Sequence, residues 1–314
     1  MKRKTNNLEG LESAPQWILM FLGAYLVVHL IALYVWNTAG RAFSIQGSSD
    51  GTSALSVTAM AAVDLWLCLL VLRSFPAGAP LRRAWMLITF AAAARAASGV
   101  LAQLLGTNWL LNPLVWAGHV KPGLIDQIRR SALIADGPVR LALLAAALLV
   151  ALRVLRKFGF WVRPSTADWA VSAIVYLFTL CRFAEAGAAS LAGRPIGTED
   201  WISLAGLPVL CVLFLEAMLL RRSVVRMGNG LISMCWAAFM CGIFLTGAGE
   251  LAAWVIPHYS HAWPIEMIQS LARFPIAAVF ALAPACQVAA QRRARNPPND
   301  QPEDLATGVP ALVP

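Results

Sequence analysis

Residues 138–157 read PVRLALLAAALLVALRVLRK, and the run from Leu141 to Leu152 carries no polar side chain. An α-helix rises 1.5 Å per residue, so a stretch of this length reaches about 30 Å, the thickness of the hydrocarbon core of a bilayer. A helix also satisfies its own backbone hydrogen bonds where water is absent. The stretch therefore predicts a membrane-spanning helix.

The same pattern recurs along the 314-residue chain, of which 59% is hydrophobic and 13% charged. This composition leaves too little polar surface to cover a soluble globule. The sequence predicts an all-α integral membrane protein with eight transmembrane helices. The other seven spans are expected near 16–37, 54–73, 84–106, 167–188, 200–220, 231–256 and 267–290.

The basic residues indicate the orientation of these spans, because Lys and Arg concentrate in cytoplasmic segments. With the Lys2-Arg3-Lys4 end in the cytoplasm, sixteen basic residues fall on the cytoplasmic side and five on the other side. We therefore predict that both termini are cytoplasmic and that the protein is a multi-pass protein of the cell inner membrane. This topology accounts for the formal charge of +9, so no nucleic-acid partner is expected.

The chain divides into two halves of four predicted helices, 1–157 and 158–290, followed by a tail over 291–314 that we expect to be disordered and cytoplasmic. Short echoes suggest that the halves form a parallel internal repeat, since Asp64 in the second span corresponds to Glu216 in the sixth. The alternative is chance similarity between apolar helices, whose restricted alphabet produces matches easily.

Five charged residues fall inside the predicted spans in a way that favours a binding site. A charge in the hydrocarbon region costs at least about 2.5 kcal/mol on insertion scales and needs a partner. The five lie between the midplane and the outer surface, and Arg182 can pair directly with Glu185 three residues later. We interpret them as an outward-facing cavity for a small polar or anionic ligand. Interhelical ion pairs that fix the helix order are the alternative. The candidate ligand-binding residues are Arg95, Arg140, Arg182, Glu185 and Glu250.

No nucleophile elbow, phosphate-binding loop or H-E-x-x-H pattern occurs, so no catalytic residue is assigned and the protein is expected not to be an enzyme. His258 and His261 could contribute to a zinc or copper site, but two loop histidines are too few ligands. We predict no metal and no cofactor.

Three functional classes follow from these observations. A transporter or small-ligand-binding protein comes first. A non-catalytic assembly subunit, with a membrane-protein partner or a second copy of itself, comes second. An intramembrane lipid-modifying enzyme with Glu250 or Asp64 as general base comes third. The bilayer is the partner common to all three.

Overall fold

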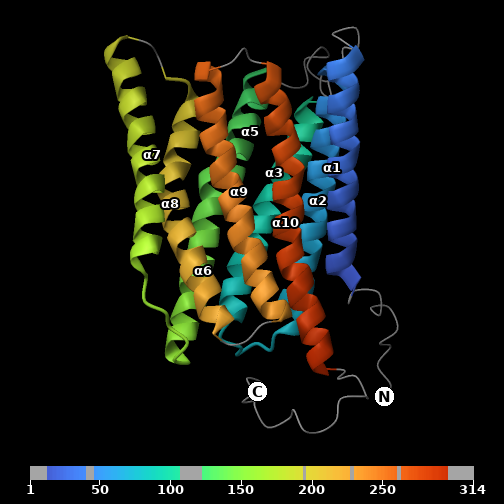
Figure 1. Cartoon of the computed structure of the whole chain (residues 1–314), viewed down its shortest axis with the longest axis vertical. Helices are drawn as coiled ribbons and strands as arrows, with labels where there is room; N and C mark the ends of the chain where they lie inside the picture. Colours follow the sequence, from blue (N-terminus) through green and yellow to red (C-terminus); the bar gives the residue numbers. More distant parts are fainter. Residues whose placement is uncertain are drawn as a thin grey trace.

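The computed structural model describes residues 13–39, 46–106, 122–193, 196–226, 230–259 and 263–295, and within these ranges it contains helices and no strand. A π-helical turn over Ala135–Val139, called the π turn below, joins α5 to α6. The helices are α1 (Ala14–Ala39), α2 (Gln46–Ser74), α3 (Arg82–Gly106), α5 (Pro122–Ile134), α6 (Arg140–Lys157), α7 (Thr166–Leu191), α8 (Thr198–Val225), α9 (Leu231–Tyr259) and α10 (Trp263–Arg295) (Figure 1).

All eight segments predicted as spans fall on these helices. For α1, the described apolar part is the shorter stretch Ala14–Val28, so the part of the chain that the structure describes supports seven spans. These seven helices fit a multi-pass membrane protein. The seven stretches that are long and apolar enough to cross a membrane are Leu55–Ser74, Arg82–Leu101, Arg130–Lys157, Thr166–Leu191, Asp200–Val225, Leu231–Leu251 and Arg273–Ala294.

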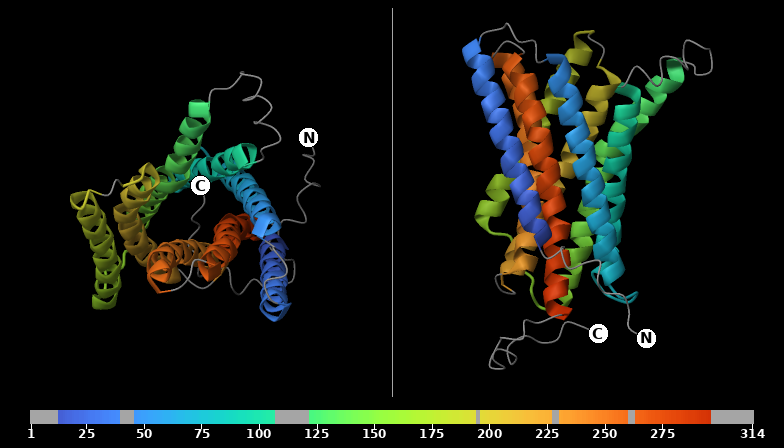
Figure 2. Two further views of the ribbon diagram at one scale, coloured as in Figure 1. Left: turned by 90° about the horizontal axis from the view of Figure 1, so that it is seen from above. Right: turned by 90° about the vertical axis from the view of Figure 1, so that its right-hand side faces the viewer.

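Six of the helices form a closed ring. Each helix contacts the next in the order α2, α3, α6, α8, α9 and α10, and α10 packs against α2 to close the ring (Figure 2). The two remaining long helices lie outside, α1 against α10 and α7 against α8. Side chains that point inward from the ring therefore share one interior, even when they come from distant parts of the sequence.

An aromatic cluster closes this interior near the start of α3. Trp85 on α3 packs against Trp236 and Phe239 on α9 with ring centroids 6.1 Å apart in both pairs. Phe239 also meets Phe280 of α10 edge to face at 6.1 Å. All four rings are buried. Such ring pairs contribute about 0.5–1.5 kcal/mol each beyond the burial of apolar area. We call these four packed residues the aromatic floor.

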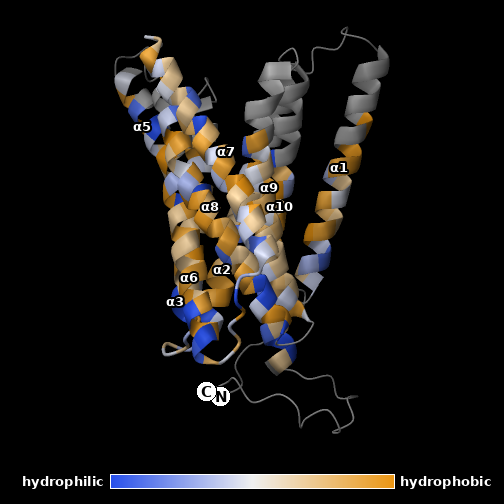
Figure 3. Ribbon diagram, turned by 60° about the vertical axis from the view of Figure 1, so that its left-hand side comes forward, coloured by the Kyte–Doolittle hydropathy of each residue, from blue (hydrophilic) through white to orange (hydrophobic). Residues whose placement is uncertain are grey.

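Hydrophilic residues gather at the end of the bundle where α3 begins and α6 and α10 end (Figure 3). The beginning of α1 lies at the same end (Figure 1). α10 continues to Arg295, five residues into the segment predicted to be disordered, because Gln, Ala and Arg are good helix formers. Ser74 at the end of α2 also donates a hydrogen bond to the Gln291 side chain. The remainder of that segment, 296–314, lies outside the described residues.

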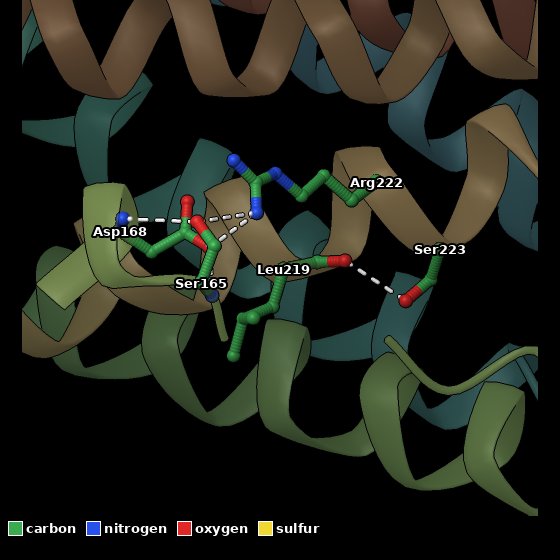
Figure 4. Close-up of polar contacts among 5 residues, drawn as sticks. All are labelled: Ser165, Asp168, Leu219, Arg222 and Ser223. Atoms are coloured by element: carbon green, nitrogen blue, oxygen red, sulfur yellow. Dashed lines mark hydrogen bonds and ion pairs between the residues drawn. The ribbon is translucent and has the colours of Figure 1, made fainter. Parts of the chain in front are cut away.

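A polar lock of Ser165, Asp168 and Arg222 fixes the start of α7 on α8. Ser165 and Asp168 form a reciprocal capping box, the signature S-x-x-D that satisfies free N–H groups of the first turn. The Asp168 carboxylate, 2% exposed, also accepts a hydrogen bond from Arg222 of α8 (Figure 4). Beside it, the Ser223 hydroxyl donates to the Leu219 carbonyl at 2.8 Å within α8. The lock therefore holds the start of α7 at the end of the bundle where the hydrophilic residues gather.

The π turn interrupts the helix between α5 and α6. Pro138 has no N–H and cannot continue the hydrogen-bond ladder, and the backbone at Gly137 leaves the helical region (φ −85°, ψ −106°). α5 consequently diverges from the ring (Figure 2). The segment from Leu124 to Ile134 belongs to α5, which runs on through the π turn into α6 as one bent element.

Candidate functional site

Charged side chains from three helices meet inside the ring, and a fourth, from the π turn, pairs with one of them. We define the charged cluster as Asp64 of α2, Arg95 of α3, Arg140 of α6 and Asp136 of the π turn. Asp64, Arg95 and Arg140 line a cavity of about 10 Å³, close to the smallest space that holds one water molecule. The residues lining it are Asp64, Ile88, Ala91, Ala92, Arg95, Arg140, Leu144, Phe239 and Phe280.

Local sequence explains how Arg95 reaches this interior. Small side chains flank it on α3, and Ala91, Ala92 and Ala96 are all buried, so α3 can pack closely against its neighbours. Arg95 lies ten residues after Trp85 on the same helix, which is about 15 Å along the axis. The charged cluster therefore lies above the aromatic floor, toward the end of the bundle that has fewer basic residues.

Both guanidinium groups lie over one aromatic ring. The Cζ atoms of Arg95 and Arg140 are each 5.8 Å from the centroid of the Phe280 ring. A cation over an aromatic face is stabilised by about 0.5–2 kcal/mol, with the larger values where water is excluded. Because two positive charges converge here, further compensation from anions is required.

The two carboxylates of the cluster balance the positive charge of the arginines in different ways. Arg140 Nε donates to the Asp136 carbonyl oxygen at 2.8 Å and lies 3.3 Å from Asp136 Oδ1. Asp64, 7% exposed, feels the charges of both arginines. Its hydrogen bond comes from Cys68 Sγ at 3.6 Å, one turn along α2. Arg140 is thus paired directly, whereas Asp64 balances the cluster through longer-range attraction.

Arg95 retains unused hydrogen-bonding capacity. Its Nη1 atom is buried and has no hydrogen-bond partner among the described residues. The Asp136 Oδ1 atom is also buried without a hydrogen bond, since its contact with Arg140 has the distance of an ion pair but Nε donates to the carbonyl oxygen. A buried polar group left unpaired costs about 1–3 kcal/mol. The cluster therefore presents a donor that an incoming acceptor would satisfy.

The structure brings two of the five predicted ligand-binding residues together. Arg95 and Arg140 share the Phe280 ring, although they come from α3 and α6. Arg182 and Glu185 form the ion pair expected from their spacing, Nη1 to Oε2 at 3.0 Å, but on α7, which lies outside the ring. Glu250 is exposed on α9 and does not line the cavity.

Asp136 and Phe280 were not identified from the sequence. The spacing of Asp136 and Arg140, four residues apart, does predict an ion pair on one helix face. Phe280 gives no such signal, because an aromatic residue in an apolar helix has many roles. Asp64 was recognised as an intramembrane charge, but its neighbours depend on the rotation of α2, which apolar patterning constrains poorly.

One further buried acidic residue lies away from the cluster. Glu216 of α8 is 8% exposed, and its Oε2 atom has no hydrogen-bond partner within the described ranges, yet it does not line the cavity. His261 lies outside the described residues, and of His258 only the backbone is described. Among the residues with described side chains, no three His, Cys, Asp or Glu residues are grouped to hold a metal ion.

No family model matches the chain, and no curated protein or solved structure is significantly similar to it. The functional argument therefore depends on the geometry of the charged cluster and of the ring.

Proposed function

We propose that the protein binds a small anionic ligand at Arg95 and Arg140 inside the helix ring, as a transporter or small-ligand-binding protein of the inner membrane. The observation that carries this proposal is the buried Nη1 of Arg95, which has no described hydrogen-bond partner, in a residue that shares the Phe280 ring and the cavity lining with a second arginine. A planar fork of donors suits a carboxylate or phosphate.

The proposed membrane topology has eight spans with both ends of the chain in the cytoplasm. Basic residues at the ends of α6, α8 and α10 support this orientation, because positive charge marks the cytoplasmic face. The charged cluster then lies on the outer side of the aromatic floor, and the ligand enters from outside or from the outer leaflet.

A four-plus-four parallel repeat is part of the proposal, and the order of the ring supports it. The contacts of α2 with α3 and of α3 with α6 recur as α8 with α9 and α9 with α10. The two junctions, α6 with α8 and α10 with α2, are also equivalent under a two-fold axis along the membrane normal. The outer helices depart from this symmetry, since α1 packs on α10 and α7 on α8.

The size of the cavity indicates that the described conformation is closed around the site. A space of about 10 Å³ admits one water at most, so a carboxylate or phosphate needs the surrounding helices to separate. Gly137 and Pro138 in the π turn, directly before Arg140, offer a place for that bending. A closed site with a bend beside it is compatible with alternating access.

Thermal unfolding of the full-length protein in nanodiscs tests the proposal with inorganic phosphate as the probe. A ligand that binds only the folded state stabilises it by about 2.7 kcal/mol at a concentration 100 times Kd. We expect phosphate to stabilise the wild type and Arg153→Gln, a matched substitution at an exposed position near the end of α6, but not Arg95→Gln. Stabilisation of folded Arg95→Gln by the wild-type amount would contradict the proposal.

The same assay decides how far the site extends. The wider site predicted from the sequence also includes Arg182, Glu185 and Glu250, whereas the cavity involves Arg95 and Arg140. If Arg182→Gln keeps the phosphate effect, the site is confined to the ring interior. If that variant loses the effect while remaining folded, the wider site applies.

A further inference from the structure

A second, larger hollow lies between α3 and the diverging α5. It has a volume of about 490 Å³, within the range of about 300–1,000 Å³ that ligand pockets occupy. One wall is α3, with Ala94, Ala97 and Ser98, and the other is α5, with Leu124, Ile128 and Ala132. We call this hollow the α3–α5 groove.

The course of the backbone forms the groove, and one hydrogen bond joins its two walls. The π turn directs α5 away from α3, and small side chains on α3 leave the space between them open. Ser98 Oγ, buried, donates to the Ala132 carbonyl oxygen at 2.8 Å and holds the two walls together. Because this hydrogen bond joins α3 to α5, we attribute the groove to the arrangement of the two helices and not to one small side chain.

The chemistry of the walls selects a hydrocarbon chain. None of the lining residues is charged, and the Ser98 hydroxyl already donates to the backbone. The remaining polar groups, Gln127 and Ser131, are exposed on α5. A free ion would find no counter-charge in this groove, whereas a chain that buries methylene groups gains about 0.8 kcal/mol for each one.

The groove and the charged cluster are neighbours along two elements. Ala94 lines the groove and the next residue, Arg95, lines the cavity. In the π turn, Ala135 lines the groove and the next residue, Asp136, pairs with Arg140. Ser98 follows Arg95 by three residues, so both occupy one side of α3. An apolar hollow and an unsatisfied guanidinium donor therefore adjoin across a single turn of helix.

From this juxtaposition we infer that the ligand is a single-chain amphipathic anion, with its hydrocarbon chain in the α3–α5 groove and its carboxylate or phosphate head directed to Arg95. The inference rests on the proposed anion site and adds the chemical class of the ligand and its entry from the bilayer. On this route the head passes beside the Ser98–Ala132 hydrogen bond, which joins α3 to α5.

Binding to the full-length protein in nanodiscs of neutral lipid tests the inference with three probes. Oleate carries chain and charge, oleyl alcohol carries the chain alone, and inorganic phosphate carries the charge alone. The variants are Ala97→Trp, which fills the groove from α3, and Ser131→Trp, which fills it from α5. Ala173→Trp, at an exposed position of α7, is the matched control for a bulky side chain facing lipid.

We expect oleate to bind the wild type and Ala173→Trp at least about tenfold more tightly than Ala97→Trp, because excluding two methylene groups has that effect. Oleyl alcohol should bind the wild type at least about tenfold more weakly than oleate. Phosphate should bind the wild type and Ala97→Trp equally. If Ala97→Trp does not fold, Ser131→Trp gives the same comparison from the opposite wall.

The outcomes separate the two proposals. Unchanged oleate affinity in both folded groove variants, or equal affinity for oleate and oleyl alcohol, overturns the amphipathic ligand and leaves the anion site standing if phosphate still requires Arg95. Phosphate and oleate binding that both survive Arg95→Gln overturns the anion site itself, and the inference falls with it.

Discussion

Phe280 is the residue on which the charged cluster depends most. Its ring carries Arg95 and Arg140 at equal distances, and it contacts Phe239 of the aromatic floor. The backbone of α9 leaves room for this ring, because a side chain at Gly242 would lie 3.0 Å from the Phe280 Cε2 atom. One aromatic side chain thus links the polar and apolar parts of the ring interior.

Replacing Phe280 with Leu should destabilise the protein by more than the loss of packing. Phe274 on the same helix is a matched control, since it is similarly buried and stacks on Tyr25 with centroids 4.1 Å apart. We expect Phe280→Leu to lower the free energy of unfolding by at least about 1 kcal/mol more than Phe274→Leu, from two lost cation–π contacts. Equal losses in denaturant unfolding would show that the ring acts only by packing.

The depth of these charged residues could be predicted from the sequence, but their convergence could not. Arg95 and Arg182 are both intramembrane arginines of the outer half in the predicted spans. Only Arg95 faces the ring interior, because α3 belongs to the ring and α7 does not. Rotation about a helix axis and the order of helices depend on packing between distant segments, which apolar patterning leaves open.

At the scale of elements, α7 shows that a helix outside the ring is held by few contacts. It packs on α8, and Ile174 and Leu177 on it are more than 60% exposed. Its polar anchor is the lock of Ser165, Asp168 and Arg222 at the basic end (Figure 4). Farther along, Thr179 Oγ1 approaches Cys211 Sγ to 3.2 Å.

Asp168→Ala should therefore weaken the protein far more than Glu185→Ala on the same helix. The first substitution removes a capping box and leaves the Arg222 guanidinium without a buried partner, with an expected loss of about 1–3 kcal/mol. The second removes an exposed pair three residues apart, with an expected loss of about 0.5 kcal/mol or less. Denaturant unfolding and proteolysis near α7 would measure both, and equal effects would contradict the role of the lock.

The positions of the helices were predicted to within a few residues for most spans, because hydrophobic length is a local property. The π turn was not predicted, although Gly137 and Pro138 are adjacent in the sequence. Pro within a membrane helix is compatible with a straight helix, a kink or a break, depending on its neighbours. The α3–α5 groove depends on that turn, so it could not be predicted from the sequence either.

At the scale of the whole molecule, the ring explains how charged residues from distant parts of the sequence reach one site. Six helices that follow each other around a closed circuit give α2, α3, α6, α9 and α10 access to one interior. The two arginines of the cavity are balanced by Asp64, which lines it, and by Asp136, which pairs with Arg140 beside it, and this balance limits the free-energy cost of burying charge.

The proposed orientation makes a prediction about reporters of membrane sidedness. A reporter fused after Gly78, between α2 and α3, should report the cytoplasm, and one fused after Gly193, after α7, should report the opposite side. The expectation follows from the number of spans that precede each position. Reporters on the same side at both positions would contradict the eight-span arrangement.

The most direct test of the anion site is a double-mutant cycle on the equilibrium binding of phosphate, using Arg95→Gln, Arg140→Gln and the double variant in nanodiscs. If both guanidinium groups hold one ligand, each single substitution should weaken binding by at least about tenfold, and the double variant should be little weaker than either, with a coupling energy above about 1 kcal/mol. Binding that is unaffected in folded Arg95→Gln, or two substitutions whose effects simply add, would contradict a shared site in the ring interior.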